Sequence, residues 1–139
     1  MLDRPLVFLD LETTGATASF DRITEIGLIE VERGRFVGEW STLVNPETRI
    51  PPFIETLTGI SNDMVALAPT FAEVARELKT RLDGKLLIAH NARFDYGFLK
   101  NEFQRLGVRY ESDVVCTVKL SRKLFPRSEE RRVGKECRL

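Results

Sequence analysis

The chain has 139 residues, of which 42% are apolar and 30% are charged, a balance typical of one soluble globular domain. Its 21 basic and 21 acidic side chains cancel, so no global positive field attracts nucleic acid, and a bound polyanion would need metal ions or a few local groups. Two cysteines exclude a disulfide scaffold, no apolar run reaches membrane length, and Asp3 and Arg4 come too early for a signal peptide, so we expect a cytoplasmic protein.

Three strands are expected in the first half of the chain. An apolar run indicates a strand over Leu6–Asp10, and alternating apolar and acidic residues indicate a second over Ile23–Glu32. A third is expected over Arg35–Val44, joined to the second by a tight turn at Arg33-Gly34. Asn45-Pro46 and Pro51-Pro52 bracket a loop, after which Phe53–Leu57 is expected to form one helical turn.

The second half of the chain alternates helices with short apolar strands. Thr70 and Glu73 have the spacing of a capping box, and apolar residues follow at helical spacing until Gly84. Together these patterns predict a helix that ends at Gly84 and a strand over Leu86–Ala89. They also predict a helix over Ala92–Leu106, a strand over Val114–Cys116 and a helix start in Thr117–Leu124. This order of elements predicts an α/β fold with a mixed sheet.

Two acidic side chains lie on one face of the first predicted strand. Because side chains alternate along a strand, Asp10 and Glu12 point the same way, with Cα atoms about 6.6 Å apart. Unpaired charge at the end of a buried strand is costly, and a divalent cation such as Mg²⁺ or Mn²⁺ is the usual compensation. Simple solvation of an acidic strand end is the alternative.

A second group of polar residues, His90-Asn91-Ala92-Arg93-Phe94-Asp95, follows the apolar strand. Asp95 falls in the first turn of the next helix and borders its buried side. Taken alone, the segment also fits capping by Asn91, an acid favoured by the helix dipole and a hydrogen-bonded core histidine. Together, Asp10, Glu12 and Asp95 match the ligand set of a two-metal phosphodiester site, in which one ion activates water and the other stabilises the leaving oxygen.

These motifs resemble those of a known enzyme family. Phe8-Leu9-Asp10-Leu11-Glu12-Thr13-Thr14-Gly15 is similar to the first motif of the DnaQ-like, DEDD-type 3′–5′ exonucleases. The segment from His90 to Asp95 resembles their second motif in its histidine-bearing subgroup, and Leu57-Thr58-Gly59-Ile60-Ser61 resembles the intervening loop. The resemblance covers residues 6–126, is nearest to bacterial DNA polymerase III epsilon subunits, and implies an RNase H-like mixed sheet with flanking helices.

The resemblance also implies a reaction and a set of site residues. It implies two Mg²⁺ or Mn²⁺ ions and release of nucleotides from a single-stranded DNA 3′ end in proofreading or repair, with a DNA polymerase catalytic subunit as a candidate partner. Asp10 would bridge both ions, Glu12 would bind the ion that activates water, and Asp95 would serve the second. The 3′-terminal nucleotide would be held or lined by Thr13, Thr14, Leu57, Thr58, Asn91 and Phe94.

One element of the family pattern is missing from the sequence. The third family motif, H-x-A-x-x-D on a last helix, supplies the general base and the final metal ligand. The single histidine of this chain, His90, belongs to the second motif. We therefore expect a domain over residues 1–126 that lacks its last helix and is impaired in catalysis. A non-catalytic nucleic-acid-binding fragment and an RNA-directed exonuclease remain open alternatives, the latter distinguished by the 2′-OH.

The C-terminal residues have a different character from the rest. Arg127 to Cys137 show no apolar periodicity and resemble the in-frame translation of a common short-read sequencing adapter, all eleven codons fitting. An ordinary basic, solvated tail is the alternative. We expect residues 127–139 to be a non-native tail fused to the exonuclease domain.

Overall fold

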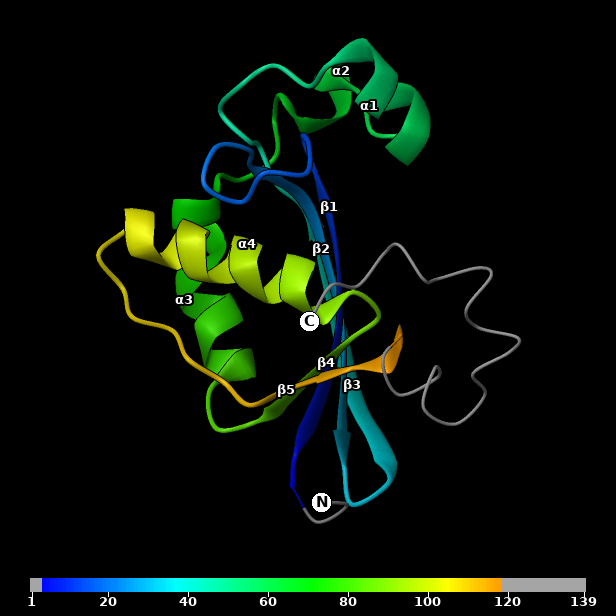
Figure 1. The fold of residues 1–139 in the computed structure, drawn as a ribbon, viewed down its shortest axis with the longest axis vertical. Coiled ribbons are helices and arrows are strands. Elements are labelled where there is room, and N and C mark those ends of the chain that lie inside the picture. The colour runs from blue at the N-terminus through cyan, green and yellow to red at the C-terminus, as the bar shows by residue number, and fades with distance from the viewer. Residues whose placement is uncertain (1–3, 119–139) are drawn as a thin grey trace.

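The computed structural model describes residues 4–118, which form one mixed sheet with its two longest helices on the same side (Figure 1). The elements, in chain order, are β1 (Leu6–Thr13), β2 (Ile23–Glu32), β3 (Arg35–Leu43), α1 (Pro52–Thr58), α2 (Asn62–Val65), α3 (Phe71–Leu82), β4 (Leu86–Ala89), α4 (Ala92–Arg105) and β5 (Val114–Cys116).

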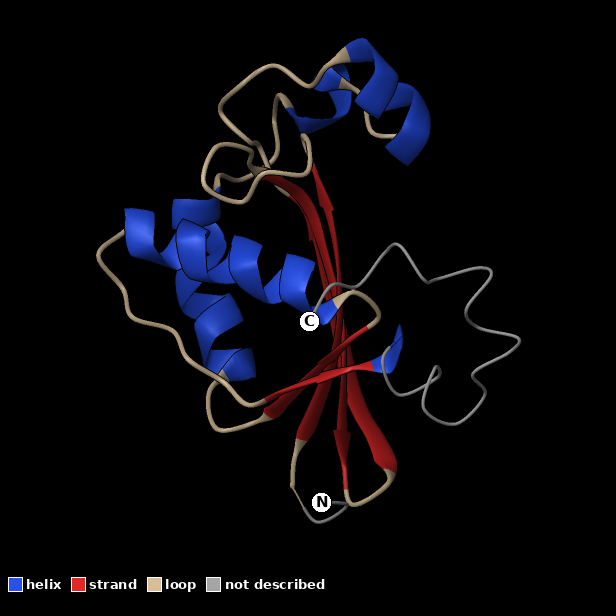
Figure 2. Ribbon diagram, in the orientation of Figure 1, coloured by secondary structure: helices blue, strands red, loops and turns tan. Residues whose placement is uncertain are grey.

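The strands lie in the order β3-β2-β1-β4-β5. The neighbours β3, β2 and β1 are antiparallel, whereas β1, β4 and β5 are parallel, so the expected mixed α/β sheet is confirmed (Figure 2). Strand β1 is central, and it is also longer than expected, because its pairing with β2 continues to Thr13. Parallel strands place their carboxyl ends at one edge, where sites in α/β sheets form.

Local sequence accounts for most element boundaries. Arg33 and Gly34 have φ values of 53° and 74°, the left-handed pair that a two-residue hairpin turn between β2 and β3 requires. At the start of α3, the Thr70 side chain accepts a hydrogen bond from the Glu73 N–H, and the Glu73 carboxylate accepts one from the Thr70 N–H. The capping box predicted from the sequence is therefore confirmed.

The core lies between the sheet and the helices α3 and α4. On β1, Val7, Leu9 and Leu11 are 0%, 5% and 5% exposed and belong to one apolar cluster. The helices contribute the largest side chains of this cluster, and the Phe71 and Phe103 rings meet edge to face at 5.1 Å. The opposite face of β1 carries Phe8, Asp10 and Glu12, so this strand separates the packed face from a more open one.

A smaller lobe holds α1 and α2 beyond the carboxyl end of β1 (Figure 1). Its own apolar cluster consists of Ile50, Ile54, Ile60 and Val65. The helix α2 was not expected from the sequence; Ser61 caps it by accepting a hydrogen bond from the Met64 N–H. The expected helical turn at 53–57 is confirmed as α1.

Two further expectations concern the end of the chain. Residues 117–118 are helical, but the rest of the predicted Thr117–Leu124 helix, the absence of a last helix and the 127–139 tail all lie outside the described residues. Within residues 4–118, none of the helices is long and apolar enough to cross a lipid bilayer.

Candidate active site

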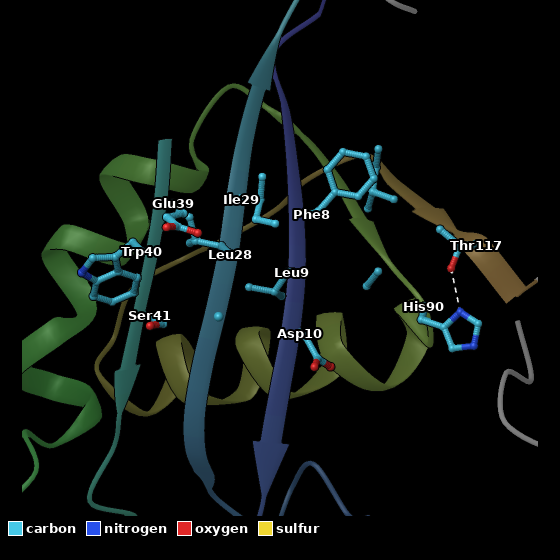
Figure 3. A pocket seen from close by; sticks show the side chains of 13 residues that line it. Phe8, Leu9, Asp10, Leu28, Ile29, Glu39, Trp40, Ser41, His90 and Thr117 are labelled. Carbon is cyan, nitrogen blue, oxygen red and sulfur yellow. Dashed lines mark hydrogen bonds between the residues drawn. The ribbon is translucent and has the colours of Figure 1, made fainter. Parts of the chain in front are cut away.

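The candidate site lies where the pairing between β1 and β4 ends and α4 begins. Leu9 of β1 pairs in parallel with Ala89, the last residue of β4, so Asp10 and His90 leave the paired segment at the same level. Figure 3 shows Asp10 and His90 at this end of an open groove over the sheet, with α4 behind β1. The His90 Nδ1 atom lies 2.9 Å from the Thr117 hydroxyl oxygen.

Asp10 and Glu12 lie on the open face of β1, as strand alternation predicts. Asp10 is exposed and pairs across the ladder with Gly27, and Glu12 is partly buried opposite Glu25. Burial, followed by the negative charges of Asp10 and Glu25, raises the pKa of Glu12. The Asp10 carboxylate is therefore close enough to oppose the ionisation of Glu12.

Asp95 is brought to the same place by α4. Its carboxyl group is only 5% exposed, as its place next to the apolar helix face predicts. Burial raises the pKa of Asp95 to about 8, with further contributions from the charges of Asp10, Glu12 and Cys116. The structure thus brings the three predicted acids into one electrostatic unit, although they are up to 85 residues apart in sequence.

The donor chemistry of these three acids suits a divalent cation. The charges of Asp10 and Glu12 both raise the pKa of Asp95, so the three carboxyl groups repel one another when ionised. Carboxylate oxygens are the donors that Mg²⁺ and Mn²⁺ prefer, and a bound cation would remove the cost of ionising a buried acid. Within residues 4–118, no group of three or more His, Cys, Asp or Glu side chains is arranged so that it could hold a metal ion.

The turn after β1 is built from the hydroxyl groups of Thr13 and Thr14. The Thr13 hydroxyl donates to the Gly15 carbonyl at 2.6 Å. The Thr14 hydroxyl donates to Asp21 Oδ1 at 3.1 Å and accepts from the Arg22 N–H at 3.0 Å. Both threonines are buried, at 6% and 3% exposed. The two threonine side chains therefore stabilise the turn. A nucleotide bound here would mainly contact the peptide backbone of the turn.

The other predicted substrate residues lie on α1 and at the start of α4. Leu57 is 71% exposed, and the neighbouring Thr58 hydroxyl donates to the Ile54 carbonyl at 2.8 Å. Asn91 precedes α4 but makes no capping hydrogen bond through its side chain, so the capping interpretation of this residue is not supported. Phe94 is partly buried against Phe98, with ring centroids 4.7 Å apart.

Glu102 and Arg22 were not singled out from the sequence. Glu102 is 1% exposed on α4, and Arg22 pairs with it at 2.9 Å. The available signal was an acid among Phe98, Leu99 and Phe103 on the apolar stripe of α4, where an unpaired charge would be costly.

Comparison with known proteins identifies the family. The RNase T family model, described as an exonuclease, matches residues 7–139. The chain belongs to this exonuclease family. It is DnaQ-like, in agreement with the two sequence motifs.

Curated bacterial relatives of this exonuclease domain are much longer proteins. The Bacillus subtilis 3′-5′ exonuclease DinG is 43% identical over 122 residues, which are 86% of this chain but 13% of that protein. The PolC-type DNA polymerase III of Caldanaerobacter subterraneus is 40% identical over 124 residues, 89% of this chain and 9% of that protein. The chain therefore spans only a small part of the relatives it matches.

Solved structures of exonucleases share the fold. Exonuclease X in complex with 5′ overhanging duplex DNA has a TM-score of 0.70 at 30% identity, over 87% of this chain and 64% of that one. The zinc-bound complex of Escherichia coli ExoI with single-stranded DNA has a TM-score of 0.79 at 18% identity, over 88% of this chain and 30% of that one. The RNase H-like fold expected from the motifs is confirmed.

Proposed function

We propose that this exonuclease domain hydrolyses DNA from the 3′ end in a divalent-metal-dependent reaction. The observation that carries the proposal is the buried Asp95 carboxyl, which lies within the electrostatic influence of Asp10 and Glu12 and has a pKa of about 8. Family membership and the 3′-5′ exonuclease DinG support the reaction and its direction.

Asp10, Glu12 and Asp95 would hold the metal ions. In sites of this type, two ions supply an activated water and stabilise the leaving oxygen of the phosphodiester. The terminal nucleotide would be contacted by the exposed Leu57 side chain and the Phe94 ring. Thr13, Thr14, Thr58 and Asn91 would line the same pocket. Apolar contact and stacking tolerate any base, as an exonuclease requires.

The 139-residue chain itself is proposed to be a slow enzyme. Its one histidine, His90, belongs to the second motif, so no histidine is available for the base of the third. A positioned general base typically contributes about 10²–10⁴-fold to a rate. Residual hydrolysis would depend on the metal ions and the three carboxylates. If that residual activity is zero, the chain only binds nucleic acid, which is the alternative function.

RNA is the second candidate substrate. The match to the RNase T family favours it, whereas the DNA in the Exonuclease X complex and the PolC-type DNA polymerase III relative favour DNA. The PolC relative also supports a DNA polymerase subunit as a proposed partner. The 2′-OH is the group on the sugar by which a site can distinguish RNA from DNA.

The test uses single-stranded DNA and RNA of one sequence, each labelled at the 5′ end, with Mg²⁺ or Mn²⁺. A 3′–5′ exonuclease shortens the labelled strand one nucleotide at a time, whereas a 5′–3′ enzyme releases the label at once. We expect a slow DNA ladder that Glu12→Ala and EDTA both abolish. A ladder that persists in Glu12→Ala, or fast turnover by the 139-residue chain, would contradict the proposed site or the proposed impairment respectively.

A further inference from the structure

Glu102 is a buried acid that the proposed chemistry does not use. Its carboxylate accepts hydrogen bonds from Arg22 Nε at 3.0 and 3.1 Å and from Arg22 Nη2 at 2.9 Å. It also accepts one from the Ile23 backbone N–H at 3.1 Å, and Arg105 Nη1 lies 3.3 Å away. Because these donors compensate the buried charge of Glu102, the carboxylate holds α4 and the start of β2 in a fixed relative position.

These contacts fall on an irregular point of the sheet. The β1–β2 register shifts after Glu12: Glu12 pairs with Glu25, but Thr13 pairs with Ile23, so Thr24 is an extra residue in β2. Such a bulge bends a strand and redirects neighbouring side chains. Glu102 accepts a hydrogen bond from the Ile23 N–H next to this bulge, so α4 holds β2 one pair beyond the pair of Glu25 with the predicted metal ligand Glu12.

The same helix carries the third acid. Asp95 and Glu102 are seven residues apart on α4, two helical turns along one face, and both are buried. Helix α4 therefore carries Asp95 in its first turn. Two turns later its Glu102 side chain binds β2, the strand that pairs with Glu12. The relative placement of Asp95 and Glu12 depends on both attachments.

The hydrogen bonds around Arg22 and Glu102 continue into the turn after β1. The Arg22 N–H donates to the Thr14 hydroxyl, which in turn donates to Asp21. From α4, Arg105 Nη2 donates to the Ser19 carbonyl at 3.2 Å. A Cβ added at Gly15 would lie 2.5 Å from Asp21 Oδ2, so the Asp21 carboxylate packs directly against the backbone of the turn.

We propose that Glu102 and Arg22 form a positioning pair that fixes Glu12 relative to Asp95 for divalent cation binding. The inference rests on the proposed function, because it assigns these residues to the same metal site. A second helix-to-sheet cluster provides the comparison: Glu30 accepts from Arg81 and Lys85, each at 2.8 Å, and pairs with Val7 at the far end of β1. Only the Glu102 pair is adjacent to the site.

Calorimetric titration with Mn²⁺, far below the melting temperature, tests the proposal on the full chain. In Glu102→Gln the side chain keeps its shape and an acceptor for Ile23 but loses its charge. We expect Mn²⁺ to bind about tenfold more weakly, the lower end of the cost of disturbing groups that orient metal ligands. Arg22→Lys keeps the positive charge but loses the paired N–H donors of the guanidinium group, so it should show a smaller loss of Mn²⁺ affinity.

Glu30→Gln is the matched control, because it also breaks a helix-to-sheet ion pair. It should lower the melting temperature while leaving the Mn²⁺ affinity unchanged. Wild-type affinity in Glu102→Gln, or an equal loss in Glu30→Gln, would overturn the positioning role. If Glu102→Gln does not fold, wild-type affinity in Arg22→Lys would overturn it. A wild type that binds no Mn²⁺ would instead refute the proposed function, and the inference with it.

Discussion

The two faces of β1 serve different purposes. Val7, Leu9 and Leu11 face α3 and α4 and are almost fully buried, whereas Phe8 on the other face is 41% exposed. The two acids that follow Phe8 on this face, Asp10 and Glu12, carry the proposed chemistry. Because strand side chains alternate, one short sequence can supply the packing on one face and the ligands on the other.

Truncating the packed face should give the largest change in stability. Leu9→Ala removes a 5%-exposed side chain from the core, and such substitutions typically cost about 2–5 kcal/mol. Phe8→Ala, on the open face, should cost less than half as much despite the larger side chain. Thermal unfolding followed by circular dichroism measures both, and equal losses would contradict the asymmetry between the faces.

A change at buried Asp95, at the start of α4, should affect stability in a pH-dependent way. Asp95 has a pKa of about 8 in the folded chain and an ordinary value of 3.8. Below about pH 4 the carboxyl is protonated in both states and contributes nothing. As the pH rises to about 8 the unfolded chain gains stability by ionising it, so the metal-free folded chain becomes less stable.

Asp95→Asn should remove this loss. We expect the variant to melt at least about 4 °C above the wild type at pH 8 without metal, and at nearly the same temperature as the wild type at pH 4. Added Mn²⁺ should stabilise the wild type and not the variant. A wild type whose stability rises between pH 4 and 8 relative to Asp95→Asn would show that the carboxyl is ionised in the folded chain without a cation.

The sequence predicted what depends on local rules. The β2–β3 hairpin follows from alternation and from Arg33-Gly34, and α3 follows from the capping box at Thr70. The proximity of Asp10 and Glu12 also follows from strand period alone. Predicting that Asp95 lies beside them depends on the order of the parallel strands, which local patterns do not give. The resemblance to the family motifs supplied that information instead.

What the sequence did not reveal depends on distant contacts. The register shift after Glu12 has no local signature. The position of Glu102 on the apolar stripe of α4 indicates that it needs a partner, but not that the partner is Arg22, 80 residues away. Helix α2 is only four residues long, and it exists because Asn62 binds Glu55 and the backbone of Ile50 in the small lobe. Such short elements are fixed by tertiary hydrogen bonds rather than by propensity.

The smallest expected effect concerns residues 127–139. Their sequence offers only Val133, Cys137 and Leu139 as larger apolar side chains, too few to offset the entropy of ordering the segment. Deleting it should change the melting temperature by no more than about 2 °C, against a much larger loss in Leu9→Ala. A loss on deletion comparable to that of Leu9→Ala would show that the segment belongs to the fold.

The central claim is that Asp10, Glu12 and Asp95 together form a metal centre, and calorimetric titration with Mn²⁺ tests it most directly. The wild type should bind weakly, because few protein ligands are available, and Asp10→Ala should show no binding heat. Glu39→Ala is the control, since Glu39 is an exposed acid in the same groove. The account predicts loss of binding in Asp10→Ala with wild-type heats in Glu39→Ala; equal heats from the wild type and Asp10→Ala would contradict it.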